Sequence, residues 1–530
     1  MVLLPVLVCA GGGAGAAGSG GTAIDLRAEA NVRIISPTPR FANDPETWVW
    51  GAGDMNGDGR PDVVVTAAET GARAVTSYVV FTRPAARSVR LASLGARGFS
   101  VADAYAFPAG DVNADGRGDL IAFHRRDLRR SHVIFGKGDS RPVNVERLGG
   151  GGFSFIGAIG GGAAGDVNGD RYADLVVGSA RSDSWYVVFG RASAAAVNVA
   201  SLGDRGFRID VPAPEFGGGA AGVGDVNGDG RGDMLIHTIS EAEAERDQLA
   251  GRLFVVFGKE SSTPVKLSDL GPDGFEIVGA IGPEVFAGVG DTNGDGLADI
   301  ALGDSDEDSP REYVYAVLGV RASEPVDLQG LGSRGYRIEG PPNEDLGSSI
   351  DAAGDINRDG LADIIIGAPG ASYNRRPESG SAYVVYGRRS TAAVKVRNLG
   401  ARGFRIDGAV RLPHDELHGA HAGEQVAGVG DVNGDGRADV GIGSSTRTAY
   451  LVFPGARPPT CRVPQLVGKR LTVARTALAR ARCAVGRVRR AYSTRVAKGR
   501  VLGQQPRHGT LLADRSRVSL VVSRGPKLRR

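Results

Sequence analysis

The sequence predicts an all-β protein, a seven-bladed β-propeller, followed by a small α+β domain. Three observations predict this fold. An acidic motif, Asp-x-Asn-x-Asp-x-x-x-Asp, occurs seven times at intervals of 55 to 76 residues. Short apolar runs follow each copy, and glycine accounts for 82 of the 530 residues, as tight turns between short strands require. A repeat of this length with four strands is typical of a propeller blade.

The strands of each repeat follow the motif in a fixed order. In the third repeat an apolar run, Asp174–Gly178, comes first and an aromatic-ending run, Tyr186–Phe189, comes second. A third run, Phe207–Asp210, alternates apolar and polar residues. With the glycine-rich segment that leads into the motif, each repeat therefore supplies four strands.

The two ends of the repeat region predict a closed ring. After the seventh motif the chain has only two strands, Val440–Ile442 and Tyr450–Phe453, while a spare strand, Val32–Ile35, precedes the first motif. Pairing of the spare strand with the last blade would complete seven blades and remove the free sheet edges that favour aggregation. We expect the propeller to span residues 24–457.

Each acidic loop is expected to bind calcium. Positions one, three, five and nine supply side-chain oxygens, and the backbone carbonyl of position seven faces the same point. Hard oxygen donors in a flexible loop suit calcium, whereas magnesium requires a tighter octahedron. Carboxylates held this close repel one another unless a cation neutralises them, so we predict up to seven calcium ions. The predicted ligands are Asp54, Asn56, Asp58, Asp62, Asp111, Asn113, Asp115, Asp119, Asp166, Asn168, Asp170, Asp174, Asp225, Asn227, Asp229, Asp233, Asp291, Asn293, Asp295, Asp299, Asp355, Asn357, Asp359, Asp363, Asp431, Asn433, Asp435 and Asp439.

The alternative is that these clusters are ordinary hairpin turns, which favour the same residues. Seven repetitions that all keep the ninth aspartate favour calcium. Individual loops differ: Arg171 replaces the glycine of position six in the third loop, while Ala114 and Arg358 replace the glycine of position four in the second and sixth. Tight binding is least certain in the third loop.

The repeats resemble a known family. The acidic loop, the Val-Val-Phe-Gly strands and the Gly367–Pro369 segment after Asp363 are similar to the FG-GAP repeats of integrin α-chain propellers, over about residues 24–457. The resemblance implies structural calcium sites on one face of a propeller and partner binding on the opposite face. Unlike that family, this chain has a loop in all seven blades and no inserted ligand-binding domain.

The tail is electrostatically opposite to the propeller. From Pro458 onwards there are 19 lysines and arginines and one acid, Asp514, whereas the rest of the chain has 44 basic and 59 acidic residues. Apolar residues at helical spacing from Leu471 to Ala481 predict a helix, and strands are expected over Val485–Tyr492 and Val518–Ser523. Residues 458–530 therefore form a separate basic α+β domain.

This tail resembles a PASTA domain. The likeness lies in Val463–Gly468, the expected helix, Gly499–Leu502, Gln504–Thr510 and Val518–Ser523. Members of that family associate with peptidoglycan, so the resemblance implies a cell-wall anchor. The positive charge would independently attract an anionic wall polymer. Nucleic acid is not expected as a partner, because Tyr492 is the tail's only aromatic residue and no groove-reading helix is apparent.

The first 23 residues predict export. Met1–Ala10 is apolar but too short to span a membrane, and Ala14–Ala16 suits a signal peptidase, so residues 1–23 read as a truncated signal peptide with a Gly/Ala-rich segment. No run of 18 apolar residues predicts a transmembrane span. We expect an extracellular, cell-wall-associated protein. In that compartment Cys461 and Cys483 would form a disulfide, with two unpaired thiols as the alternative.

The sequence favours a binding module over an enzyme. His414, His418 and His421 cluster in the longest spacer, but they lack the order of a zinc protease motif, so a polar insertion loop is favoured. Two Arg-Gly-Asp tripeptides end in the ninth-position residues Asp119 and Asp233, which are committed to the ion. We predict an adhesion or interaction module whose propeller contacts a protein or glycan, with no catalytic residues. The alternative is a secreted hydrolase or wall-processing enzyme that uses the propeller as a scaffold.

Overall fold

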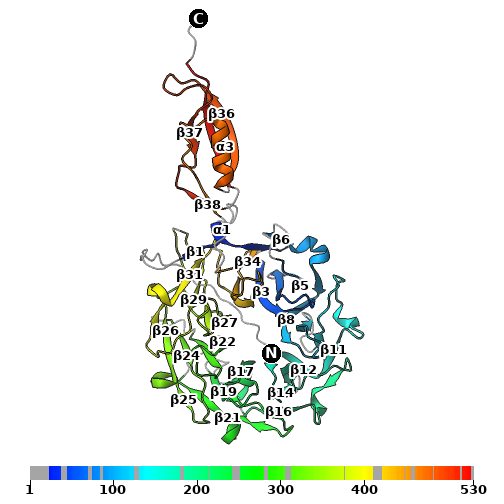
Figure 1. The fold of residues 1–530 in the computed structure, drawn as a ribbon. Coiled ribbons are helices and arrows are strands. Elements are labelled where there is room, and N and C mark those ends of the chain that lie inside the picture. The colour runs from blue at the N-terminus through cyan, green and yellow to red at the C-terminus, as the bar shows by residue number, and fades with distance from the viewer. Residues whose placement is uncertain are drawn as a thin grey trace. The chain divides into compact units, whose positions relative to one another are not determined.

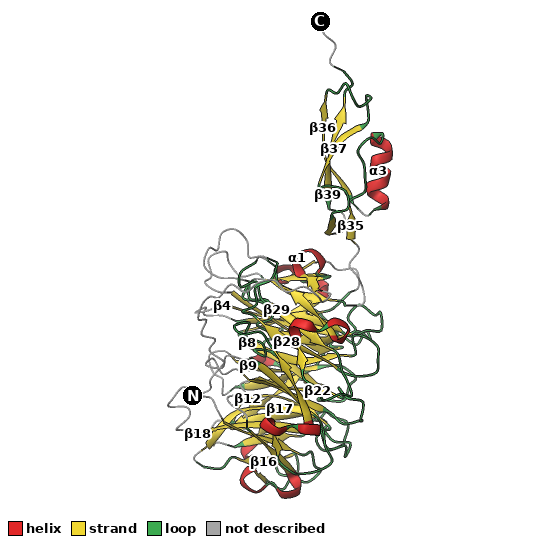
Figure 2. Cartoon of the chain, turned by 90° about the vertical axis from the view of Figure 1, so that its left-hand side faces the viewer, coloured by secondary structure: helices red, strands yellow, loops and turns green. Residues whose placement is uncertain are grey.

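The computed structural model describes residues 23–36, 45–69, 75–83, 88–124, 130–179, 184–213, 215–240, 251–279, 285–304, 312–374, 376–409, 420–446, 448–454, 460–481, 483–513 and 516–526. The chain divides into a large compact unit, Met1–Leu26 with Val32–Gly455, and a small one, Arg27–Asn31 with Ala456–Arg530. Figure 2 shows that strands dominate the large unit and that the long helix belongs to the small one.

The described part of the large unit contains seven sheets. In each of them, four strands lie side by side and antiparallel. The predicted all-β propeller is confirmed. From the innermost strand outwards, the blades are β3 (Pro45–Gly53), β4 (Asp62–Glu69), β5 (Thr76–Val80), β7 (Gly98–Ala102); β8 (Ala104–Gly110), β9 (Asp119–His124), β10 (Ser131–Ile134), β11 (Gly152–Ile156); β12 (Ala158–Gly165), β13 (Asp174–Ser179), β14 (Trp185–Val188), β16 (Gly206–Asp210); β17 (Glu215–Gly224), β18 (Asp233–Ser240), β19 (Gly251–Val256), β21 (Gly274–Val278); β22 (Val285–Gly290), β23 (Asp299–Asp304), β24 (Tyr313–Val317), β26 (Gly335–Glu339); β27 (Ile350–Gly354), β28 (Asp363–Ala368), β29 (Ser381–Val385), β31 (Gly403–Asp407); and β32 (Val426–Gly430), β33 (Asp439–Ile442), β34 (Thr448–Val452), β2 (Val32–Ile35).

The blades form a closed ring around their innermost strands (Figure 1). These strands contact one another in the order β3, β8, β12, β17, β22, β27, β32 and back to β3. The apolar cores lie between neighbouring blades: Val64 and Phe99 of the first blade pack with Leu120 and Ile134 of the second. The second strand of a blade is covered on both faces, which is why it reads as a continuous apolar run. A single blade therefore cannot bury its apolar surface alone.

The predicted closing strand is confirmed. β2 pairs antiparallel with β34 of the seventh blade, with Ile34 opposite Ala449. The structure adds β1 (Ala23–Asp25), which pairs in parallel with β31 of the sixth blade, and α1 (Leu26–Glu29), which connects β1 to β2. The N-terminal segment therefore joins the last two blades.

Most outer blade edges are covered in a way that the sequence reading missed. A short strand from the next repeat pairs in parallel with the outermost strand, as Val265 does with Ile209. The signal was present in the sequence as a recurring Val-x-Leu or Val-x-Val before each Gly-Phe or Gly-Tyr strand, but two or three residues are too few to recognise as a strand. These edge strands are β6 (Ser88–Arg90), β15 (Val197–Asn198), β20 (Val265–Lys266), β25 (Val326–Asp327) and β30 (Val394–Lys395).

The small unit is α+β, as predicted. A sheet in the order β36, β39, β37 packs with α3 around a core that includes Leu466, Leu478 and Leu520. The expected helix and strands agree with the observed ones to within one residue. The elements are β35 (Thr460–Arg462), α3 (Leu471–Arg480), β36 (Ala484–Ala491), β37 (Val501–Gln505), β38 (Leu511–Ala513) and β39 (Arg517–Ser523).

Candidate metal centre in the acidic loops

Each of the seven acidic loops connects the innermost strand of a blade to the second strand. The first loop follows β3, and its ninth residue, Asp62, opens β4. The same placement holds in every blade, so all seven loops lie at the same end of their inner strands and on one face of the ring. Each predicted set of four residues thus lies within a single loop.

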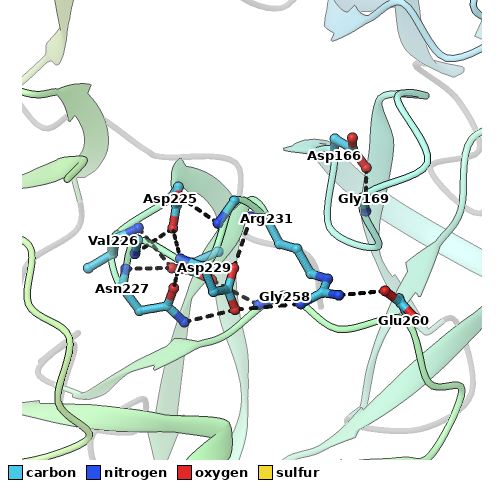
Figure 3. A network of polar contacts seen from close by, with 12 residues as sticks. Asp166, Gly169, Asp225, Val226, Asn227, Asp229, Arg231, Gly258 and Glu260 are labelled. Carbon is cyan, nitrogen blue, oxygen red and sulfur yellow. Dashed lines mark hydrogen bonds and ion pairs between the residues drawn. The ribbon is translucent and has the colours of Figure 1, made fainter. Parts of the chain in front are cut away.

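The fourth loop shows how the first aspartate organises the turn (Figure 3). The Asp225 Oδ1 atom accepts hydrogen bonds from the backbone N–H groups of Gly228 (2.6 Å) and Asp229 (3.0 Å), and Oδ2 accepts one from Gly230 (2.9 Å). Gly228 and Gly230 have φ angles of 76° and 86°, in the left-handed region that glycine adopts without strain. One carboxylate therefore binds the N–H groups of three consecutive residues and fixes the turn.

The third and fifth residues of this loop face each other. The Asn227 Oδ1 atom accepts the N–H of Asp229 (2.8 Å), and Asn227 Nδ2 donates to Asp229 Oδ2 (3.2 Å). The same amide-to-carboxylate contact occurs in the second to sixth loops. In the first and seventh loops, by contrast, Asn56 and Asn433 donate to the ninth aspartate at 3.0 Å. The amide group thus occupies the space between the carboxylates.

The ninth aspartate is the buried member of each set. Asp233 has no exposed surface; its Oδ2 accepts the N–H of Val226 (2.8 Å), and its Oδ1 accepts the N–H of Gly258 beyond the third strand (2.8 Å). Burial raises the pKa of Asp233 to about 7, and repulsion from Asp229 acts in the same direction. The seven residues at this position are all fully buried: Asp62, Asp119, Asp174, Asp233, Asp299, Asp363 and Asp439.

The raised pKa is common to all seven ninth-position carboxyls. Burial is the main cause in each, and it brings the pKa of Asp299 to about 6, that of Asp439 to about 8 and those of the other five to about 7. No lysine or arginine in the described chain forms an ion pair with any of them. A buried carboxylate without a cationic partner is neutralised by a proton or by a bound cation.

The loops have the right donor chemistry for calcium, but their carboxylates are not gathered around a point. Within the described residues, no group of three or more His, Cys, Asp or Glu side chains is arranged to hold a metal ion. The reason is local: the first carboxylate turns to three backbone N–H groups, and the asparagine amide stands between the others. The predicted ligand set and the seven calcium ions therefore stay predictions.

Neighbouring loops are hydrogen-bonded to one another, which the sequence reading did not anticipate. The N–H of position eight donates to the carbonyl of position one in the preceding loop, as Ala173 does to Asp111 at 2.9 Å. Six such bonds connect the loops in series, and each position eight is glycine or alanine. At the remaining junction Pro61 has no N–H to donate, and it packs against Gly430 instead. The loops therefore belong to the contacts between blades.

The departures from the motif are tolerated in different ways. Arg358, with φ of 65°, extends its guanidinium to the seventh loop and donates to the carbonyls of Gly436 (3.0 Å) and Asp435. It therefore joins two loops. Ala114 and Arg171 also adopt left-handed backbone, with φ of 54° and 75°, but among the described contacts neither side chain donates to another loop.

Replacing Arg171 by glycine is expected to stabilise the protein. A left-handed backbone costs a non-glycine residue about 1 kcal/mol, so R171G should raise the free energy of unfolding by about that amount. The reverse change, Gly230→Ala, is the matched control, since a Cβ there would meet nothing within 4 Å. The midpoint of urea unfolding should rise in R171G and fall in Gly230→Ala relative to the wild type. An R171G midpoint equal to or below the wild-type value would contradict the strain argument.

The remaining predicted groups are placed as follows. His414 and His418 lie outside the described residues, whereas His421 is described and lies 3.9 Å from Glu378. Cys483 lies in the core of the small unit, and Cys461 lies on β35, but the side chain of Cys461 is outside the described set. The disulfide stays a prediction. Asp119 and Asp233 of the Arg-Gly-Asp tripeptides are buried, as expected.

An aromatic cluster lies on the inner strands of the first two blades. Trp48 is 6.0 Å from Trp50 and 6.2 Å from Tyr105 between ring centres, and Trp50 is 4.8 Å from Phe107. All four rings are half-buried. Trp48 precedes the first loop by six residues, or roughly 20 Å of strand, so the cluster extends away from the acidic face. The matching stretch of the third blade, Gly160–Gly165, contains only glycine and alanine.

A polar network lies over the sixth blade, beyond the strand ends opposite the acidic loops. The carboxylate of Glu344 accepts hydrogen bonds from the hydroxyls of Tyr373 (2.9 Å) and Tyr383 (2.7 Å). Arg405 stacks on the ring of Tyr373 at 3.4 Å and pairs with Asp407. Burial raises the pKa of Glu344. The donors around Glu344 hold the loop before β27 against the loop before β29.

Comparisons with known proteins agree with this architecture. Residues 346–385 match the FG-GAP repeat, and residues 462–524 match the PASTA domain. The chain therefore combines integrin-like FG-GAP repeat content with a PASTA domain, as the sequence patterns predicted.

Curated relatives are integrin α-chains. Integrin alpha-2 of Mus musculus is 37% identical over 116 residues, which cover 21% of this chain and 9% of that protein. Integrin alpha-IIb of Homo sapiens is 30% identical over 162 residues, 29% of this chain and 15% of that protein. Integrin alpha-4 of Xenopus laevis is 26% identical over 205 residues, 38% and 17% respectively. The matches thus span less than a fifth of these relatives' length.

Among solved structures, the entire extracellular region of the Ser/Thr kinase PrkC from Staphylococcus aureus aligns with 12% of this chain and 23% of its own. The identity is 23% and the TM-score is 0.12, so this likeness carries no argument. Among the described helices, none has the length and apolar character needed to cross a membrane.

Proposed function

We propose that this protein is an exported interaction module in which a calcium-stabilised propeller is tethered to the bacterial cell wall by its tail. The observation that carries the proposal is the pairing of the two modules: FG-GAP repeat content in the large unit and a PASTA domain in the small one. The PASTA resemblance supports attachment to peptidoglycan or an anionic wall polymer. Extracellular, wall-associated localisation follows from the same resemblance.

Calcium would stabilise the ring of blades rather than take part in a chemical reaction. In the fourth loop the ion would be held by Asp225, Asn227, Asp229 and Asp233, and it would supply the positive charge that the buried carboxylates lack. Each loop is hydrogen-bonded to its neighbour, so fixing one loop also fixes a contact between blades. The same role extends to the other loops, giving up to seven ions.

The propeller would contact its partner on surfaces away from the acidic loops. The cluster of Trp48, Trp50, Tyr105 and Phe107 supports this assignment, because large half-buried rings suit recognition of a protein or glycan. A hydrolase that uses the propeller as scaffold is the second candidate. It is favoured by the raised pKa of Glu344, although both oxygens of that carboxylate already accept hydrogen bonds.

A disulfide between Cys461 and Cys483 would stabilise the tail in an oxidising compartment. It would connect β35 to the end of the helix region, where Cys483 is only 6% exposed. Closing a loop of this size contributes on the order of 3 kcal/mol, which is a large share of the stability of such a small domain.

Sedimentation with purified cell-wall sacculi tests the tether. The full-length protein should pellet with the sacculi, and a chain that ends at residue 457 should stay in the supernatant. Soluble wall fragments measured in the same tubes test the hydrolase alternative, and we expect none above the background of sacculi incubated without protein. If the full-length protein failed to pellet at moderate salt, the tether would be wrong.

A further inference from the structure

One end of the small unit's sheet gathers cationic side chains around an exposed tyrosine. The end of the central strand β39 lies between two segments: Val522 pairs with Arg490 of β36 on one side and with Val501 of β37 on the other. Just beyond it, the N–H of Arg524 donates to the carbonyl of Ala491 at 2.8 Å. Three chain segments therefore meet at this end of the sheet.

The segment before β37 completes the assembly. The N–H of Ser523 donates to the carbonyl of Arg500 (2.8 Å), and the carbonyl of Ser523 accepts the N–H of Gly499 (2.9 Å). The Ser523 hydroxyl donates to the carbonyl of Val496 (2.6 Å). These bonds fix the 495–500 turn beside the end of β39. The basic and aromatic residues that these segments place at this end of the sheet form what we term the basic cluster: Arg490, Tyr492, Arg495, Lys498, Arg500 and Arg524.

All six side chains of the basic cluster are exposed. Tyr492 is 54% exposed, and the guanidinium of Arg524 lies 5.6 Å from the centre of its ring. Arg500 also donates to the carbonyl of Gly468 at 2.8 Å, which fixes the direction of its side chain. The cluster therefore presents five positive charges and one aromatic face to solvent.

Among the described residues, no carboxylate forms an ion pair with these side chains. The sole acid after Pro458 is Asp514, which lies outside the described residues, and none of the ion pairs of the described chain involves the small unit. The propeller differs, since there Arg252 pairs with Glu215 and Glu276. Five like charges without a carboxylate partner among the described residues attract a polyanion, because bringing phosphates among them relieves their mutual repulsion.

We propose that the basic cluster binds a phosphodiester-linked polyol polymer of the cell wall. This inference rests on the proposed function in taking the tail as the wall-binding module. The arginines suit bidentate phosphate contacts, Lys498 supplies a point charge, and the Tyr492 ring packs against the polyol or sugar between phosphates. Peptidoglycan has carboxylates only on its peptides, whereas a phosphodiester polymer has a negative charge in every repeat unit and so matches five clustered cations better. Single-stranded nucleic acid favours successive aromatic platforms, and the tail has one aromatic residue.

Binding should depend steeply on salt. Five phosphate contacts on a flexible polyanion correspond to a slope of about −3.5 in a plot of log affinity against log salt. Affinity should therefore fall roughly a hundredfold between 50 and 200 mM salt.

The test uses the full-length protein in calcium-containing buffer and a fluorescent poly(glycerol phosphate) as the probe. A cluster variant, R490Q/K498Q/R524Q, is compared with a control that removes the same charge elsewhere on the small unit, R475Q/R480Q/R517Q. We expect the cluster variant to bind on the order of a hundredfold more weakly at 50 mM salt and the control to stay within about threefold. Y492A should bind about threefold more weakly than Y492F, which keeps the ring.

The outcomes separate this inference from the proposed function. Equal losses of affinity in both triple variants would mean that the polymer is attracted by the overall positive charge of the small unit rather than by the basic cluster, and would overturn the inference. Tighter binding of duplex or single-stranded DNA than of the polymer would also overturn it. Binding to sacculi stripped of phosphate polymers, without binding to the polymer itself, would refute the basic cluster while leaving the tether intact. Failure to bind either would refute both.

Discussion

Replacing Ile34 by aspartate is expected to destabilise the propeller more than any other single change considered for this chain. Ile34 is fully buried on β2, opposite Ala449 of the seventh blade and beside Val89 of β6. An aspartate there would place an unpaired charge between apolar strands, at a cost of about 4 kcal/mol or more. Because β2 is the only strand that completes the seventh blade, the penalty acts at the closure of the ring.

Urea unfolding followed by circular dichroism measures this loss. The matched control is Arg33→Gln on the same strand, since Arg33 is exposed and donates to the carbonyl of Leu26 at 3.5 Å. The control should stay within about 1 kcal/mol of the wild type. An I34D midpoint close to that of the control would mean that the ring does not depend on β2.

The N-terminal segment that closes the ring is also attached to the sixth blade. Arg376, before β29, donates to both carboxylate oxygens of Asp25 on β1, at 2.8 and 2.6 Å. The guanidinium also donates to the carbonyl of Gly408 (2.8 Å). This bidentate pair holds the start of the chain to the sixth blade while β2 completes the seventh. Two neighbouring blades thus share one N-terminal segment, and weakening either attachment should weaken the other.

Much of this architecture follows from residue patterns. The repeated Asp-x-Asn-x-Asp-x-x-x-Asp spacing fixes where inner and second strands meet, and the unmatched strand before the first motif is enough to predict closure through β2. Both patterns rest on local chemistry: side chains that turn the backbone, and alternation that matches a half-buried strand. The helix and strands of the tail follow from the same rules.

Other features could not be read from local pattern. The hydrogen bonds between loops depend on backbone groups, which the residue pattern does not reveal. Pro61 interrupts this series, but its effect can be recognised only when the seventh loop is known to be its neighbour. The covering edge strands are two or three residues long, too short for a periodic signal. Trp48 and Tyr105 are 57 residues apart in the numbering and meet because two inner strands are neighbours in the ring.

Removal of calcium is expected to lower the stability of the propeller substantially. A site saturated at a hundred times its dissociation constant contributes about 2.7 kcal/mol, so several saturated sites together amount to on the order of 10 kcal/mol. Differential scanning calorimetry should show a lower melting temperature in chelator than in millimolar calcium, with magnesium restoring little of the difference. Titration of the chelated protein should find several ions per chain. A melting temperature indifferent to chelator would refute the calcium proposal.

A single-loop variant separates ion binding from loop structure. Asp229 is exposed at position five, so Asp229→Asn should fold normally in chelator and lose part of the stabilisation that calcium provides. The control is Asp204→Asn, the same chemical change at an exposed position outside the loops. The control should respond to calcium as the wild type does. Equal calcium responses in the two variants would remove Asp229 from the ligand set.

The pH dependence of the chelated protein gives an independent test of the same carboxyls. Burial raises the pKa of Asp233 in the folded protein to about 7, above the value of about 3.9 expected for an unfolded chain. The folded state then binds more protons than the unfolded state between these values, so the chelated protein should become less stable as the pH rises from about 4 through 7. With calcium bound, cation and proton compete for one carboxylate, and the ion supplies the neutralisation at high pH. The stabilisation by calcium should therefore be largest near pH 8 and shrink toward pH 5. A calcium effect that is constant over this range would place the ion away from the buried ninth-position carboxylates.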